Sequence, residues 1–200
     1  MQTADTRLIE RIHQRNLDRA IATACGTHPD RRAPCVTETK LAATERTLGI
    51  PLPPLVRSLY LHVGNGGFGP EYGIVGIRGG VKLDGDTLET CYAGLHGLAK
   101  ENPIWRWPSQ LLPLSNYGSG MWSCVDLTYQ RYPMFLWDPN DLQDDLEGPD
   151  AQGNWANSFW DQGLTLKQWL RGWLDGTEEP EPKWPSASWI RKRLGFDIAA

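Results

Sequence analysis

The 200-residue chain has no uninterrupted apolar run of the length that crosses a bilayer. A transmembrane helix needs about 20 consecutive, predominantly apolar residues. Residues 1–16, MQTADTRLIERIHQRN, carry charges where a secretion signal would be apolar. We therefore expect a soluble, cytoplasmic protein that has no membrane partner.

The sequence also lacks the motifs of the common catalytic sites. It contains no HExxH and no GxSxG, and neither glycine-rich stretch (GNGGFG, GIRGG) is followed by the GKS or GKT of a phosphate-binding loop. The spacing of its acids does not fit a calcium-binding EF-hand loop. We expect no enzymatic activity, no catalytic residue and no cofactor. HExxH spacing is absent among the four histidines, which are His13, His28, His62 and His96.

Cysteine is sparse, and no CxxC pair is present. In a cytosolic chain of this length, cysteines are expected to be reduced thiols. Cys25, His28 and Cys35 could ligate zinc, but a fourth ligand is missing nearby and their spacing is not a standard structural set. We therefore expect loop or core residues here and no bound metal. The four cysteines are Cys25, Cys35, Cys91 and Cys124.

Basic charge is not in excess, because the formal net charge is -4. This balance argues against nonspecific nucleic-acid binding, which uses a basic surface. The acids gather in residues 138–150, DPNDLQDDLEGPD, which hold six acids and no base. The segment is interpreted as a solvated acidic loop. Its acids are Asp138, Asp141, Asp144, Asp145, Glu147 and Asp150.

Tryptophan is the residue in marked supply, with ten copies. Large aromatic side chains are mostly buried, so a role in the core is the first interpretation. The alternative is an aromatic binding surface, because Trp is favoured at interface hot spots.

Hydrophobic spacing predicts helices first, then strands joined by short turns, then helices again. This order predicts an α+β fold with a mainly antiparallel sheet of five or six strands, helices packed on one side and an additional N-terminal helix. Expected helices are 6–24, 38–48, 53–63, 87–100, 165–175 and a short 187–194. Expected strands are 72–77, 109–114, 121–127 and 133–137, with 155–160 either a strand or a helix entry. The expected divisions are 1–36 (helix and loop), 37–177 (main domain) and 178–200 (tail).

Residues 38–67 read ETKLAATERTLGIPLPPLVRSLYLHVGNGG. The order of an acidic residue, LG, LP, an apolar helix and NGG resembles the opening pattern of the SUKH superfamily. The downstream pieces LPL (112–114), CVDL (124–127), WD (137–138) and SF (158–159) are also similar, so the resemblance covers about 38–175. The motif residues are Glu45, Leu48, Gly49, Leu52, Pro53, Tyr60, Asn65, Gly66 and Gly67.

The motif residues have structural explanations. Gly49 can close a helix in the left-handed conformation, and Pro53-Pro54 can begin the next one. Asn65, Gly66 and Gly67 accept positive φ cheaply, so we expect at least one of Gly64, Gly66 and Gly67 to have it. None of these residues performs acid–base chemistry, and function has to be sought on the surface.

The SUKH superfamily includes a yeast regulator of cell-wall synthesis and many bacterial immunity proteins. The resemblance therefore implies an immunity-type protein that binds a toxin domain and blocks it by occlusion. A regulatory scaffold with no toxin partner is the alternative, and a glycan binder that stacks sugars on tryptophan is a third. Many toxins of such systems are nucleases, which tend to be basic, and an acidic loop would steer their association. Plain solubility explains the same acids equally well. The candidate partner-binding residues are Asp141, Asp144, Asp145, Glu147, Trp122 and Tyr129.

Overall fold

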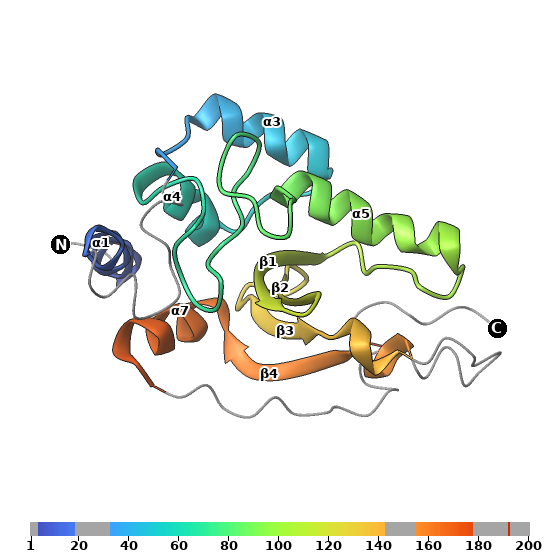
Figure 1. The fold of residues 1–200 in the computed structure, drawn as a ribbon. Coiled ribbons are helices and arrows are strands. Elements are labelled where there is room, and N and C mark those ends of the chain that lie inside the picture. The colour runs from blue at the N-terminus through green and yellow to red at the C-terminus, as the bar shows by residue number, and fades with distance from the viewer. Residues whose placement is uncertain (1–3, 19–32, 143–154, 178–191, 193–200) are drawn as a thin grey trace.

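Figure 1 shows the computed structural model of the chain, which describes residues 4–18, 33–142, 155–177 and 192. Helices α1 (Ala4–Leu17), α3 (Glu38–Leu48), α4 (Pro54–His62) and α5 (Leu88–Glu101) come first. Strands β1 (Leu111–Gly118), β2 (Met121–Asp126), β3 (Pro133–Trp137) and β4 (Phe159–Thr165) follow, with the 3-10 turn η2 (Pro139–Asp141) after β3 and helix α7 (Leu166–Asp175) after β4. The predicted α+β class is confirmed.

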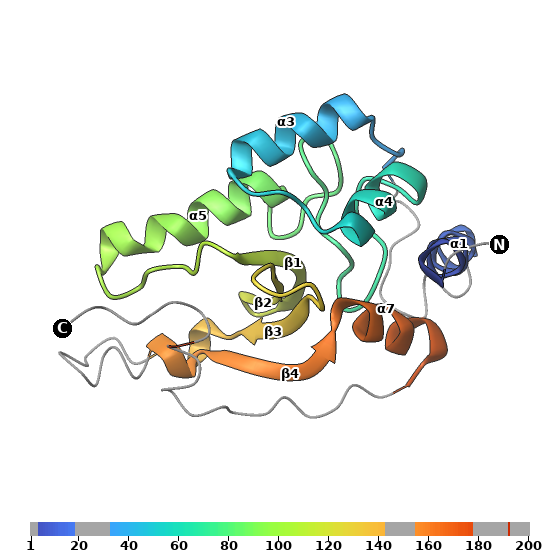
Figure 2. The same ribbon diagram turned by 180° about the vertical axis from the view of Figure 1, so that it is seen from behind.

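The strands form one antiparallel meander in the order β1-β2-β3-β4. The described sheet thus has four strands, one or two fewer than expected. Figures 1 and 2 show α3, α4 and α5 gathered on the β1 side of the sheet, while α7 leaves directly from the end of β4. Each strand pairs with the next strand along the chain, and residues 127–132 are enough to connect β2 to β3.

Residues 72–77 do not form the strand that was expected there. Glu71 has φ 58° and Gly73 has φ 92°, so the backbone turns where an extended strand would continue. The segment still lies along the outer edge of β1. Ile74 forms an isolated bridge with Ser115, and the Val75 N–H donates to the Leu114 carbonyl at 2.9 Å. This edge of the sheet is therefore covered by irregular backbone.

Other boundaries also differ from the sequence prediction. The strand expected at 109–114 is β1, which runs from Leu111 to Gly118. Helix α1 begins two residues earlier than expected and ends at Leu17, not at residue 24. The ambiguous residues 155–160 hold one helical turn followed by the start of β4, which runs on to Thr165. Asp161 and Gly163 are poor strand formers, and pairing with β3 overrides their propensity.

The core is shared by the sheet and all the described α-helices. From α1, Leu8 is 3% exposed and Ile12 is fully buried, so this helix contributes to the same core as the sheet. An ion pair between Lys167 and Asp5 (2.7 Å) links α1 to α7. The division of the chain at residues 36 and 177 stays a prediction. The expected helix at 187–194 lies, apart from residue 192, outside the described residues.

Asn65 is the polar centre of the turn that joins the helices to the sheet. Its side chain is 1% exposed; its Oδ1 accepts from the Ile77 N–H (2.9 Å) and its Nδ2 donates to the Ile77 carbonyl (3.2 Å). Its backbone carbonyl accepts from the Val81 N–H at 2.9 Å. A Cβ at Gly80 would lie 2.3 Å from the Asn65 Cγ, so no larger residue fits there.

The expected positive φ in the NGG turn is confirmed. Gly66 has φ 86° and Gly67 has φ 81°. At Gly66 the backbone also approaches another chain segment, because a Cβ there would lie 2.5 Å from the Gly76 nitrogen. Glycine is thus required at residue 66 for two reasons, conformation and space.

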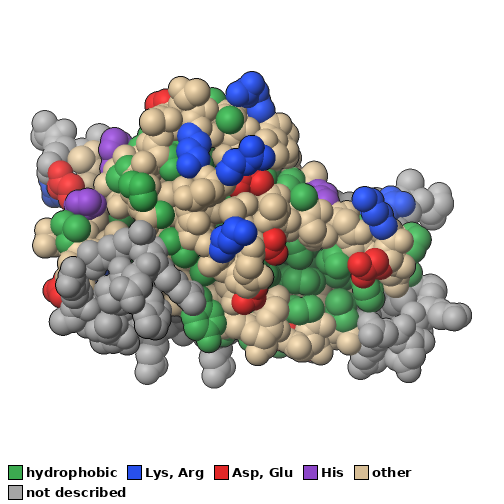
Figure 3. All heavy atoms as spheres, turned by 45° about the horizontal axis from the view of Figure 1, so that its top comes forward, with side chains coloured by type: hydrophobic (Ala, Val, Ile, Leu, Met, Phe, Trp, Pro, Cys, Tyr) green, Lys and Arg blue, Asp and Glu red, His purple; other side chains and the backbone are tan. Residues whose placement is uncertain are grey.

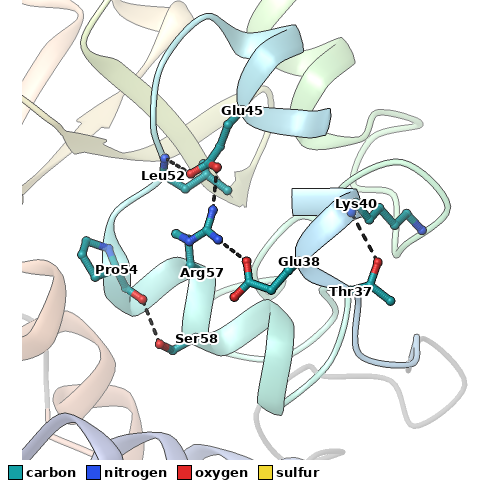
Figure 4. Close-up of polar contacts among 8 residues, drawn as sticks. All are labelled: Thr37, Glu38, Lys40, Glu45, Leu52, Pro54, Arg57 and Ser58. Carbon is teal, nitrogen blue, oxygen red and sulfur yellow. Dashed lines mark hydrogen bonds and ion pairs between the residues drawn. The ribbon is translucent and has the colours of Figure 1, made fainter. Parts of the chain in front are cut away.

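Glu45 joins α3 to the start of α4, as Figure 4 shows. Its Oε1 accepts from the Leu52 N–H at 2.9 Å, and its Oε2 accepts from Arg57 at 2.5 Å. Arg57 also pairs with Glu38. The hydrogen bond to Glu45 is the largest influence that raises the pKa of Arg57. Gly49, with φ 72°, ends α3 between these contacts, as expected for a helix C-cap.

Replacing Gly66 by alanine should destabilise the protein more than replacing Gly49. Both residues have positive φ, which costs a non-glycine residue about 1–2 kcal/mol. Only Gly66 is crowded, since a Cβ at Gly49 has nothing within 4 Å. We expect an additional loss of about 1–3 kcal/mol for Gly66→Ala, measured as the free energy of unfolding in urea. Equal losses for the two variants would contradict the account of the turn.

Removing Glu45 should cost more stability than removing Glu38. Glu45 bonds both a backbone N–H and Arg57 and its side chain is 20% exposed, whereas the Glu38 side chain is 67% exposed. We expect about 1.5–3 kcal/mol for Glu45→Ala and about 0.5 kcal/mol for Glu38→Ala. Urea unfolding of both variants tests this, and a larger loss for Glu38→Ala would show that the exposed ion pair dominates.

Candidate functional site

The acidic segment enters the described structure at the end of β3. Asp138 caps η2 by accepting from the Asn140 N–H at 2.9 Å. Asp141, the first of the candidate partner-binding acids, is partly exposed and its Oδ2 accepts from the Trp160 Nε1–H at 2.8 Å. Asp141 therefore also orients an aromatic side chain of β4. The other candidate acids, Asp144, Asp145 and Glu147, lie outside the described residues.

Trp122 is not the exposed aromatic anchor that was expected. It is 5% exposed and lies opposite Trp137 in the β2–β3 pair. The burial pattern of β2 explains this, because all five residues from Trp122 to Asp126 are buried and no strand position there faces solvent. Burial of Trp122 removes it from the surface that a partner would meet.

Five of the eight described tryptophans are buried in the core and do not form a binding platform. Trp107 meets Trp137 edge to face with ring centroids 5.3 Å apart, and Trp155 meets Phe159 in the same way at 5.2 Å. Such aromatic pairs add to the stabilisation that comes from burial. The hypothesis of sugar stacking on tryptophan loses its structural basis at these residues. The buried tryptophans are Trp107, Trp122, Trp137, Trp155 and Trp169.

Tyr129 is exposed, as expected, with 46% of its surface accessible. It lies in the connection between β2 and β3, whereas Asp141 follows the other end of β3. A five-residue strand such as β3 spans roughly 17 Å. The structure therefore places these two candidate residues at opposite ends of the sheet and does not bring them together.

Two other tyrosines lie at the end of the sheet that holds Asp141. Tyr72 is 51% exposed and Tyr117 is 45% exposed. Tyr117 immediately precedes the β1–β2 turn, and the Tyr72 N–H donates to the Asn116 carbonyl at 3.2 Å. The sequence analysis missed both. A signal was present, because each is an aromatic residue next to glycine at a turn or a strand end, where the chain leaves the core.

A cleft of about 490 Å³ opens beside Tyr72. One wall is the β1–β2 turn, and another is a two-residue hairpin whose tip is Asp84-Gly85. Both tip residues have positive φ (50° and 88°), and Leu83 and Asp86 exchange backbone hydrogen bonds of 3.0 and 2.9 Å. An Asp-Gly pair of this kind is the usual sequence of a type I′ turn. The lining residues are Tyr72, Lys82, Leu83, Asp84, Gly85, Asn116, Gly118 and Ser119.

Asn116 ties the two walls together. It is 2% exposed; its Nδ2 donates to Asp84 Oδ2 at 2.5 Å, and its Oδ1 accepts from the Gly118 N–H at 2.8 Å. The turn is held from its other side by Asn140, whose Nδ2 donates to the Ser119 carbonyl at 3.1 Å. The cleft and the start of the acidic segment thus form one continuous end of the sheet.

The described residues do not provide a site for a metal ion. Cys25 and His28 lie outside the described residues, and Cys35 is exposed. The described residues contain no group of three or more His, Cys, Asp or Glu that could hold a metal ion. Burial raises the pKa values of Cys91 and Cys124 and lowers that of His96. These two buried cysteines therefore remain protonated thiols at neutral pH.

Charges of both signs cover the face drawn in Figure 3. Lys and Arg side chains are spread over the upper half of that face, with Asp and Glu side chains among and below them. Nonspecific nucleic-acid binding uses a uniform basic surface, which this face does not provide. Among the described helices, none is both long and apolar enough to cross a bilayer.

Comparison with known proteins identifies a family. No curated protein and no solved structure matches the chain. The model of the SMI1 / KNR4 family (SUKH-1) matches residues 35–161, which hold α3, α4, α5, strands β1 to β3, the cleft and the start of β4. This span covers more than half of the 200 residues, and it contains the motif from Glu45 to Gly67. The chain therefore belongs to the SMI1 / KNR4 family (SUKH-1).

Proposed function

We propose that this protein is an immunity-type protein that binds a toxin domain and neutralises it by occlusion. The observation that carries the proposal is the end of the sheet where exposed tyrosine, a cleft and carboxylates lie together on a family scaffold. Exposed aromatic residues beside a pocket are the kind of anchor that dominates protein–protein affinity. The motif residues of the family, by contrast, are engaged in structural hydrogen bonds and turns.

Carboxylates at this end suit a basic partner. Asp84 and Asp138 are described here, and the sequence continues with further acids up to Asp150 and no base. Like charges grouped on a surface raise the association rate of an oppositely charged partner and make that rate depend on salt. A nuclease toxin, whose own substrate is a polyanion, would present such a basic surface.

Co-expression with the product of a neighbouring toxin gene tests the proposal. We expect the protein to restore growth of cells that express the toxin domain, and the two purified proteins to form a stable complex by calorimetry. Absence of both growth protection and complex formation would overturn the proposal. Tight binding of a host protein that is not toxic would instead favour the regulatory scaffold.

Neutralising the acidic segment should slow binding without unfolding the protein. The triple variant Asp144→Asn, Asp145→Asn, Glu147→Gln leaves Asp141 in place, because Asp141 holds Trp160. The sequence predicts a solvated loop here, and exposed charges contribute less than about 1 kcal/mol each to stability. On that prediction the melting temperature should hardly change.

The association rate with the toxin domain should fall several-fold at low salt and lose much of its salt dependence. Stopped-flow mixing at two salt concentrations measures both effects. Asp175→Asn serves as the control, because this residue is exposed in α7 and pairs with Arg11 away from the cleft. An unchanged rate at low salt would show that the acids at 144–147 do not steer association with the toxin domain.

A further inference from the structure

We propose that the cleft beside Tyr72 receives an arginine side chain of the partner protein. The inference rests on the proposed function in one respect, that the partner is a protein. The group that the cleft recognises is a guanidinium, so a short arginine peptide can test it without knowledge of the partner.

The cleft has an aromatic wall that is already fixed in place. Tyr72 is 51% exposed, yet its ring lies against the β1–β2 turn, where a Cβ on Gly118 would lie 3.0 Å from a ring carbon. Gly118 has φ 101°, so it is a position that only glycine occupies easily. A ring held in this way loses little conformational entropy on binding, and its open face can stack on a planar cation.

The cleft also has a carboxylate that is held in position. Asp84 lies at the tip of the Asp-Gly hairpin, and its Oδ2 accepts from Asn116, a residue that is 2% exposed. The other oxygen, Oδ1, has no hydrogen-bond partner among the described residues. A side chain that is already oriented by a buried amide pays a smaller entropic cost when a ligand arrives.

Charge around the cleft favours a cation. Lys82 is the one base among the described lining residues, and Asp84 is the one acid. Two further acids, Glu71 and Asp86, lie directly beside lining residues in the chain, so acids outnumber bases around the cleft. Asp138 lies one contact further away, because it binds Asn140, whose side chain donates to the Ser119 carbonyl. Lys82 opposes a cationic ligand, which makes it an informative position for a variant.

The geometry favours arginine over lysine. A guanidinium is planar, stacks on an aromatic face and donates through a fork of N–H groups to a carboxylate. The ammonium of lysine is a compact, strongly hydrated charge that gains less from a flat ring. A cleft of about 490 Å³ has room for the guanidinium and the carbons that carry it.

The probe is the peptide acetyl-Gly-Arg-Gly-amide, titrated into the full-length protein and followed by amide chemical shifts in NMR. The peptide with citrulline in place of arginine has nearly the same shape without the charge, and the lysine peptide has the charge without the plane. We expect saturable shifts at Tyr72, Asp84 and Gly118 with the arginine peptide, weaker binding of the lysine peptide and no saturation with citrulline.

Variants on the two sides of the cleft should act in opposite directions. Asp84→Asn keeps an acceptor for Asn116 and tolerates positive φ, so the fold should survive while the dissociation constant rises about threefold or more, the factor for one exposed charge pair. Lys82→Gln should lower the dissociation constant by a similar factor. Tyr72→Ser should abolish saturation. Tyr129→Ser, equally exposed at the opposite end of the sheet, should change nothing.

Three outcomes would overturn the inference: no saturable shifts with the arginine peptide, equal binding of the citrulline peptide, or an unchanged dissociation constant in both Asp84→Asn and Lys82→Gln. These results are independent of the growth assay. Arginine binding without growth protection would refute the immunity proposal alone, and growth protection that survives in a protein without arginine binding would refute this inference alone.

Discussion

The buried side chain of Asn65 is the contact on which the connection between the helices and the sheet depends. Its amide satisfies both the N–H and the carbonyl of Ile77, and its backbone binds residues 33 and 81. A buried polar group without partners costs more than a hydrogen bond returns, so these bonds are all required together. They also require close backbone approach, and this explains why Gly66, Gly76 and Gly80 have no room for a Cβ. The hairpin with Asp84 at its tip begins directly after Val81, whose N–H donates to the Asn65 carbonyl.

Periodicity and turn residues were enough to predict the class of the fold and most helix boundaries. Helix 38–48 has the expected ends because Thr37 and Gly49 are local signals, and their hydrogen bonds and φ values depend only on neighbouring residues. The strand predicted at 72–77 was wrong. The apolar residues of this segment are buried against β1, and only an isolated bridge, from Ile74 to Ser115, forms there. Residues 161–165 were missed because pairing with β3 is a long-range contact that local propensity does not contain.

The site was harder to predict than the fold, for a physical reason. Whether an aromatic residue is exposed depends on which strand face it occupies, and residues 122 to 126 are buried on both faces of β2. Trp122 is therefore in the core, while Tyr72 reaches solvent from a turn and Tyr117 from the end of β1. Residues far apart in the chain, such as Asp84 and Asn116, meet only when the hairpin closes on β1. The Asp-Gly pair was visible in the sequence, but the sequence did not show that Asn116 would be the hydrogen-bond partner of Asp84.

The irregular segment along β1 has a consequence for how this protein meets others. An exposed sheet edge is a template onto which any extended chain can add by backbone pairing, with little regard to its side chains. Here the Leu114 and Asn116 carbonyls already accept from Val75 and Tyr72. Strand addition at this edge is blocked, so recognition beside it has to discriminate by side-chain chemistry. For the proposed contact, changing a few turn residues would alter the specificity and leave the sheet intact.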